Sequence, residues 1–197
     1  MSVPKHVKIC EMGPRDGLQN EKAQIATRDK ITYIDLLSRT GLQLIEATSF
    51  VSPKAIPRLA DASEVFAGVT KAPGVRYLVL TPNRKGLERA KAAGVDSIAV
   101  FTAASESFTK KNINMTIEES LNVFGEVIRE ARANNMWVRG YVSTAFGCPY
   151  EGAVPVQNVV RVTEALQNLG CDEISIGDTI GVGVPTQVDE LIPELLE

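Results

Sequence analysis

The sequence predicts an α/β fold, a (β/α)8 TIM barrel in one domain over residues 1–197, with six of the eight β/α units present. Short apolar strands alternate with amphipathic helices, which is typical of a parallel sheet with right-handed crossovers. Polar residues follow nearly every predicted strand, and barrels build their sites from several strand ends on one face. An open doubly wound sheet would also alternate, but the Gly-rich dinucleotide fingerprint is absent after the first strand.

Composition narrows the class of protein. The hydrophobic content of 44% and charged content of 23% are ordinary for a globular domain. A net charge of −3 favours neither nucleic acid nor a membrane surface as partner, and no apolar run reaches the ~20 residues of a membrane span. The three cysteines are widely spaced without a CxxC, and the start of the chain leaves no room for a leader peptide, so we expect a cytoplasmic protein.

In the first half of the chain, β-branched and apolar runs predict four strands, at residues 7–12, 44–50, 76–80 and 97–102. Three helices are predicted between them. The first has Thr27 as its N-cap and ends near residues 40–41, the second begins at Pro57, and the third covers about residues 84–93.

The second half predicts helices and strands with clearer end signals. Thr116 and Glu119 form a capping box before an apolar helical stripe. Strands are predicted at residues 137–143 and 173–176, separated by a helix over residues 156–169 that Gly170 ends. Pro185 opens a last helix that continues to Glu197.

Arg15 and Asp16 follow the first strand, which Gly13 and Pro14 end. A fixed guanidinium can hold developing negative charge, and a carboxylate oxygen suits Mg²⁺ or Mn²⁺. The alternative is a loop salt bridge with Gly17 serving the turn. Further polar residues follow the other strands: Glu46 and Ser49, Thr81 and Asn83, Tyr141 and Ser143, Asp178 and Thr179.

Seven segments together resemble the 3-hydroxy-3-methylglutaryl-CoA lyase family. They are residues 13–21 (GPRDGLQNE), 46–54 (EATSFVSPK), 80–83 (LTPN), 108–114 (FTKKNIN), 139–143 (RGYVS), 147–152 (GCPYEG) and 177–183 (GDTIGVG). The related Claisen-type synthases share the Arg-Asp-Gly start, whereas the LQNE extension and the CPYEG loop are similar to the lyases.

The resemblance implies a divalent metal cofactor, an acyl-CoA substrate, and cleavage of 3-hydroxy-3-methylglutaryl-CoA to acetyl-CoA and acetoacetate, as in leucine degradation. It implies Arg15, Glu46 and Asp178 as catalytic residues and Asp16 as a metal ligand. The substrate-binding residues that it implies are Gln19, Lys111, Asn112, Arg139, Tyr141 and Thr179. A homodimer is the assembly that the resemblance allows.

Several of these residues have simpler explanations. Glu46 and Asp178 could pair with Arg15 or Arg139, and Asp178 could instead cap the last helix. Lys111 could form an ordinary solvated pair with Lys110, and Tyr141 could be a core residue. The capping role of Asp178 would not exclude catalysis.

The chain also departs from the family pattern. The family's further metal ligands form a His-x-His pair, whereas the only histidine here is His6, predicted to lie on the surface. Cys148 precedes Pro149 and Tyr150, but in a different loop from the family's reactive cysteine. We therefore expect half a metal site within these residues. The alternatives to a lyase are an acyl-CoA-binding remnant without turnover and a Claisen-type synthase.

Overall fold

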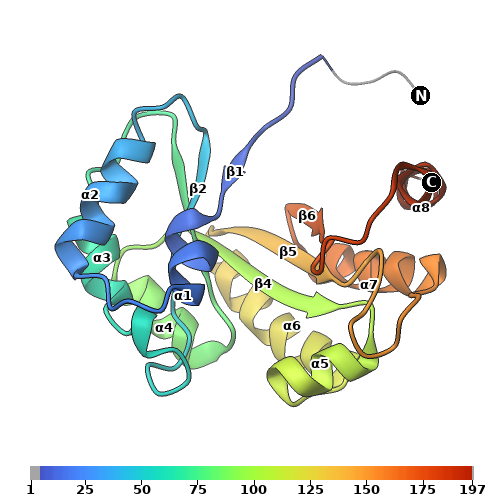
Figure 1. The fold of residues 1–197 in the computed structure, drawn as a ribbon. Helices are drawn as coiled ribbons and strands as arrows, with labels where there is room; N and C mark the ends of the chain where they lie inside the picture. The colour runs from blue at the N-terminus through green and yellow to red at the C-terminus, as the bar shows by residue number, and fades with distance from the viewer. Residues whose placement is uncertain (1–4, 197) are drawn as a thin grey trace. The chain divides into compact units, whose positions relative to one another are not determined.

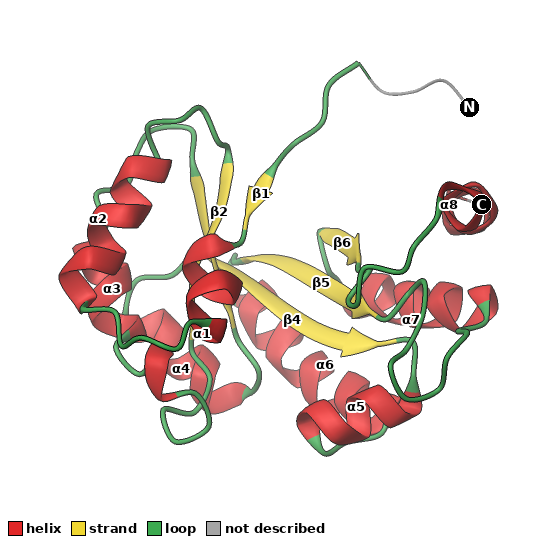
Figure 2. Cartoon of the chain, viewed as in Figure 1, coloured by secondary structure: helices red, strands yellow, loops and turns green. Residues whose placement is uncertain are grey.

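The computed structural model describes residues 5–196, so the predicted start at residues 1–4 and the predicted helix end at Glu197 lie outside the described residues. The chain divides into two compact units, Met1–Ile98 and Ala99–Glu197, which we describe separately (Figures 1 and 2). Strands that are consecutive in the sequence are neighbours in the sheet, in the order β1-β2-β3 in the first unit and β4-β5-β6 in the second. Among the described residues, no helix is long and apolar enough to cross a membrane.

The first unit alternates strands and helices. Its elements are β1 (Cys10–Glu11), η1 (Gly13–Gly17), α1 (Leu18–Asn20), α2 (Thr27–Leu37), β2 (Leu44–Ser49), η2 (Pro57–Leu59), α3 (Ala62–Gly68), β3 (Arg76–Leu80) and α4 (Arg84–Ala92). The strands β1, β2 and β3 are parallel. Helices α2 and α3 pack on each other and on β2. The core between them includes fully buried Ile34, Ile45, Leu59 and Leu78, which fits the predicted apolar faces.

Four predictions for this unit were inaccurate. The strand expected at residues 7–12 is only two residues long, and Val7 is 76% exposed, because pairing with β2 involves only Cys10 and Glu11. Residues 13–20, expected as a loop, are helical. Thr27 is not the N-cap of α2, since its hydroxyl donates to Asp61 Oδ2 at 2.8 Å. The helix expected from Pro57 is split into η2 and α3.

The second unit follows its predicted boundaries closely. Its elements are β4 (Ser97–Ala103), which begins in the first unit, α5 (Glu106–Ile113), α6 (Ile117–Ala133), β5 (Trp137–Ser143), α7 (Val156–Leu169), β6 (Glu173–Ile176) and α8 (Pro185–Leu196). The capping box of Thr116 and Glu119 is confirmed, and Gly170 ends α7 with a φ of 104°. Helix α5 was not predicted, and Ser105 caps it by accepting a hydrogen bond from the Phe108 amide.

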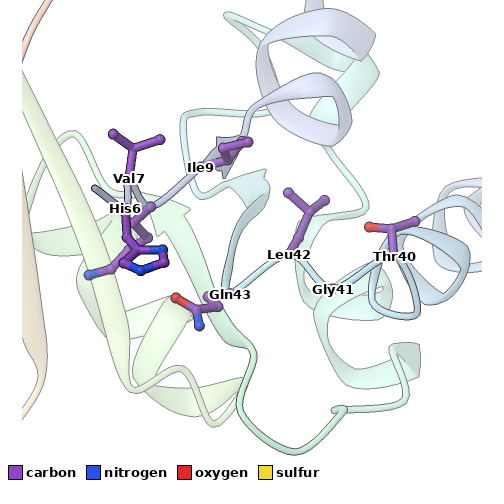
Figure 3. Close-up of a pocket in the computed structure, with 8 residues that line it drawn as sticks. His6, Val7, Ile9, Thr40, Gly41, Leu42 and Gln43 are labelled. Carbon is purple, nitrogen blue, oxygen red and sulfur yellow. The ribbon is translucent and has the colours of Figure 1, made fainter. Parts of the chain in front are cut away.

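One pocket of about 410 Å³ lies where the chain enters β1 and β2 (Figure 3). It is lined by residues 6–9 and 40–43. His6 contributes to this lining and is exposed, which confirms that it is a surface residue. None of the predicted site residues lines this pocket.

Candidate active site

The turn after β1 places Arg15 and Asp16. The Met12 carbonyl accepts hydrogen bonds from the Arg15 amide at 3.1 Å, the Asp16 amide at 2.7 Å and the Gly17 amide at 3.4 Å. The bond from Gly17 spans five residues and makes this a π-helical turn directly after the strand. A Cβ atom at Gly13 would collide with the Tyr33 hydroxyl and lie 2.8 Å from Glu11 Oε1. A side chain at position 13 would therefore require the Tyr33 and Glu11 side chains to move. Turns with π-helical geometry are frequent at functional sites.

Arg15 joins two carboxylates. Its Nε and Nη2 both lie 3.0 Å from Glu46 Oε2, and its Nη1 lies 2.7 Å from Asp16 Oδ1. The Glu46 side chain is fully buried, the Arg15 side chain is 11% exposed, and the Asp16 side chain is 55% exposed. The predicted salt bridge therefore exists, and it includes Glu46. A planar guanidinium can serve both carboxylates in one geometry, which a lysine cannot.

An irregularity in β2 determines which side chains accompany Glu46. Glu46 pairs with Leu78 and Ser49 with Leu80, but Thr48 pairs with Val79, so β2 contains one extra residue over this step. Paired residues share a face, and Leu78 and Leu80 lie on the same face. Glu46 and Ser49 therefore lie on the same face of the sheet. In a regular strand these two residues, three positions apart, would lie on opposite faces.

The remaining predicted residues of the first unit have different surroundings. Gln19 lies in α1, and its Oε1 is buried with no hydrogen-bond partner among the described residues. Such an acceptor is available to a ligand donor. Asn83 is the N-cap of α4, where it accepts from the Gly86 amide at 2.9 Å, so its function is local.

In the second unit, β5 carries a half-buried polar face. Val138, Gly140 and Val142 are buried, whereas Arg139 and Tyr141 are half-buried on the opposite face. The Arg139 guanidinium lies 5.1 Å from the Tyr141 ring centroid, and its Nε is 3.3 Å from Glu173 Oε1 of β6. The contact with Glu173 lacks hydrogen-bond geometry, and Arg139 Nη1 has no hydrogen-bond partner among the described residues. Arg139 therefore keeps donor capacity for an anionic or carbonyl group.

Asp178 and Thr179 lie in the loop after β6, and both accept backbone hydrogen bonds. The Asp178 carboxylate accepts from the Val182 amide at 3.0 Å and the Gly183 amide at 2.9 Å. Thr179 Oγ1 accepts from the Thr144 amide at 2.7 Å, so the Thr179 proton remains available to donate to another group. Asp178 thus closes its own loop instead of pairing with Arg139 or capping α8.

Lys111 and Asn112 lie near the end of α5 and are exposed. Lys111 Nζ is 4.0 Å from the Tyr150 ring centroid, so it is not merely solvated beside Lys110. The predicted residues thus form one group in the first unit, with Arg15, Asp16 and Glu46, and three groups in the second. The second unit's groups are Arg139 with Tyr141, Asp178 with Thr179, and Lys111 with Asn112.

Two partners of these residues, Tyr150 and Glu173, were missed. Glu173 faces Arg139 because the register of β5 and β6 pairs the two positions. A sequence pattern cannot give that register. The CPYEG string was noticed as a family feature, but its contact with α5 required a helix that the sequence did not predict.

The protonation of Glu151 can be used to follow the contact between the CPYEG segment and α5. Its carboxylate accepts from the Ser107 amide at 2.6 Å, and that hydrogen bond holds the pKa of Glu151 below its usual value. Because the pKa of Glu151 is lower in the folded state, the ionised carboxylate stabilises the contact at pH values above the unfolded-state pKa. This stabilisation is lost as the pH falls through the folded-state pKa. We expect the Ser107 amide proton resonance to titrate with a midpoint below 4.5. In Glu151→Gln this titration should disappear, and a midpoint at or above 4.5 would contradict the contact.

The described residues fit a metal only in part. Among residues 5–196, no group of three His, Cys, Asp or Glu side chains comes together as a metal-binding cluster. Asp16 offers one accessible carboxylate, and one of its oxygens is shared with Arg15. Mg²⁺ and Mn²⁺ prefer about six oxygen or nitrogen ligands. Among the described residues, Asp16 could therefore supply one ligand of such a site, and these residues do not form a complete one.

The parallel strands in sequence order and the helices between them define the class of protein as a (β/α) barrel. Residues 6–197 match the HMGL-like family model, so the chain belongs to the HMGL-like family. It is 56% identical over 194 residues to "Hydroxymethylglutaryl-CoA lyase, mitochondrial" of Bos taurus, covering 98% of this chain and 60% of that protein. It is 54% identical to "3-hydroxy-3-methylglutaryl-CoA lyase, cytoplasmic" of Rattus norvegicus, covering 99% of this chain and 57% of that protein.

A solved structure gives the same result for the fold. The hydroxymethylglutaryl-CoA lyase of Pseudomonas aeruginosa superposes with a TM-score of 0.96 at 50% identity, covering 99% of this chain and 65% of that chain. The predicted fold class, a TIM barrel with six of its β/α units present, is therefore confirmed. The chain spans about 60% of the length of the curated relatives that it matches.

Proposed function

We propose that this polypeptide carries the larger part of the active site of a carbon–carbon lyase. The substrate would be 3-hydroxy-3-methylglutaryl-CoA, and the products acetyl-CoA and acetoacetate. The observation that carries the proposal is the buried Arg15–Glu46 pair with Asp16 beside it, directly after β1, in a chain about 55% identical to proteins named as these lyases. Leucine degradation is the metabolic role that fits this reaction.

The proposed reaction is a retro-Claisen cleavage. A base takes the proton of the tertiary hydroxyl, the hydroxyl oxygen becomes the ketone of acetoacetate, and the bond between C2 and C3 breaks. The electron pair of that bond passes to C2 as the thioester enolate, which takes up a proton to become acetyl-CoA. The Arg15 guanidinium would stabilise the enolate oxygen, because a fixed cation in a partly buried site strongly favours developing negative charge.

Glu46 and Asp178 would have different functions in this reaction. Glu46 is fully buried and bound to Arg15, so it would orient the guanidinium. Asp178 is exposed in its loop, although its carboxylate accepts two backbone amides. It would exchange a proton with the substrate only through the lone pairs that these amides leave. Gln19, Lys111, Asn112, Arg139, Tyr141 and Thr179 would bind the acyl-CoA.

A divalent metal would polarise the tertiary hydroxyl, and Asp16 is the residue of this chain that would hold it. With a single carboxylate available, we expect Mn²⁺ to bind the 197 residues with a Kd no tighter than about 10⁻³ M. Isothermal titration calorimetry measures this value, with Asp29→Asn as a control at an exposed carboxylate of similar surroundings. Micromolar binding that disappears in Asp16→Asn would show that the described residues complete the site and would contradict the assignment of Asp16 as their single metal ligand.

The cleavage is tested on the chain extended by the two β/α units that complete the barrel of a relative. We expect this extended chain to release acetyl-CoA and acetoacetate in the presence of Mg²⁺ or Mn²⁺, followed by a coupled acetoacetate assay. Binding of the thioester without any release of acetyl-CoA would support a non-catalytic acyl-CoA-binding protein, the alternative that the incomplete donor set favours. Condensation of acetyl-CoA with an oxo acid would indicate a synthase.

We further propose a cytoplasmic location. The described cysteines Cys10, Cys148 and Cys171 form no disulfide with one another, which is typical of a reducing compartment. The relatives do not decide the compartment, because some are named mitochondrial and others cytoplasmic. A homodimer is the proposed assembly, and sedimentation of the extended chain would test it.

A further inference from the structure

Residues 148–151 form a short loop that we call the CPYE loop. The Cys148 amide donates to the Gly152 carbonyl at 2.8 Å, and the Gly152 amide donates back to the Cys148 carbonyl at 2.9 Å. These two hydrogen bonds close the loop at its base. Tyr150, near its tip, is 50% exposed, so its ring is accessible at the surface.

The CPYE loop is held against the start of α5 at three points. Cys148 Sγ accepts a hydrogen bond from Ser105 Oγ at 3.0 Å, and Ser105 is the residue that caps α5. Glu151 Oε1 accepts from the Ser107 amide at 2.6 Å. The Tyr150 ring lies 6.3 Å from the Phe108 ring, centroid to centroid. The buried thiol of Cys148 therefore serves as a hydrogen-bond acceptor that attaches the loop to the helix.

This attachment places the Tyr150 ring beside the end of α5. Lys111 Nζ lies 4.0 Å from the centroid of that ring, within the distance at which a cation and an aromatic face attract each other. An exposed lysine otherwise samples many rotamers, and binding a ligand requires it to lose that freedom. A ring on one side of the ammonium group restricts it while leaving N–H donors directed away from the ring.

We propose that Tyr150 is a positioning residue that holds the Lys111 ammonium ready for the phosphate-bearing part of an acyl-CoA. The inference rests on the proposed function, in which Lys111 binds the substrate. The chemistry fits a phosphate better than a neutral group, because a lysine ammonium binds phosphate oxygens as a compact charge with several donors. Tyr150 acts through Lys111, and its hydroxyl has no part in the effect.

The test is a double-mutant cycle on the 197-residue chain, with CoA as the probe and Kd measured by calorimetry. Tyr150→Leu is expected to weaken CoA binding about three- to five-fold, the effect of one exposed cation–aromatic contact. Tyr150→Phe, which keeps the ring, should bind as the unchanged chain does. In the Lys111→Ala background, Tyr150→Leu should have no further effect. Pantetheine, which lacks the phosphates, should bind all variants equally, and Lys110→Ala controls for the loss of one charge on α5.

If Tyr150→Leu weakens CoA binding by the same factor with Lys111 present and in the Lys111→Ala background, the inference is overturned. The proposed function would not be affected by that result. No binding of CoA by the unchanged chain would instead overturn the proposed substrate class. A second measurement then decides the positioning itself. The ε-methylene proton resonance of Lys111 should be shifted upfield by the Tyr150 ring, keep that shift in Tyr150→Phe and lose it in Tyr150→Leu. Absence of the upfield shift in the unchanged chain would overturn the inference regardless of ligand.

Discussion

Replacing Arg15 by lysine is expected to reduce the turnover number of the extended, eight-unit chain by on the order of 10²–10³-fold, since loss of one oxyanion-stabilising donor has an effect of this size. In the structure the guanidinium contacts Glu46 through Nε and Nη2 and Asp16 through Nη1. A lysine ammonium is a point charge on a flexible stem and cannot span both carboxylates. The enolate oxygen would then face a cation that is neither fixed nor correctly directed.

The matched control is Arg28→Lys, at an exposed arginine that also pairs with the aspartate next to it in sequence. We expect this variant to keep normal turnover, because its ion pair is exposed at the surface. Circular dichroism should show an unchanged fold for both variants, since a positive charge remains beside the buried Glu46. Turnover of Arg15→Lys within a factor of about three of the unchanged protein would contradict the assignment of Arg15 to the transition state.

Replacing Asp61 by alanine is expected to lower the free energy of unfolding by about 3–5 kcal/mol, the usual cost of removing one partner from a buried ion pair. Lys30 is only 4% exposed in its side chain, and its Nζ donates to Asp61 Oδ1 at 2.7 Å and Oδ2 at 2.9 Å. A third hydrogen bond goes to the Arg58 carbonyl at 2.5 Å. Without Asp61, a buried ammonium would retain one acceptor, and Thr27 would lose its acceptor as well.

Urea unfolding of the 197-residue chain measures this effect. Asp29→Ala serves as the control, because its ion pair with Arg28 is exposed and should contribute less than about 1 kcal/mol. Lys30→Met should cost less than Asp61→Ala, since it removes the buried charge instead of isolating it. A change below about 1 kcal/mol in Asp61→Ala would mean that the Lys30 ammonium reaches water, contrary to its burial.

The sequence alone was most successful where the signals are local. The capping box at Thr116, the glycine that ends α7 and the bounds of β3, β5 and β6 were all predicted correctly. A cap or a helix end depends on hydrogen bonds between residues three or four apart, so its pattern is visible in the sequence. The alternation of these elements also determined the fold class, because parallel strands need helical crossovers.

The tertiary structure decided what depends on residues distant in the sequence. The β2 irregularity that places Ser49 on the face of Glu46 follows from pairing with β3, and the Arg139–Glu173 contact follows from the register of β5 and β6. The Lys30–Asp61 pair joins two elements about thirty residues apart. Such contacts are selected by packing and by the need to satisfy buried polar groups, which no local pattern records. The sequence could therefore predict Arg15, Asp16 and Glu46 as candidate site residues, but only the fold could show one guanidinium contacting both carboxylates.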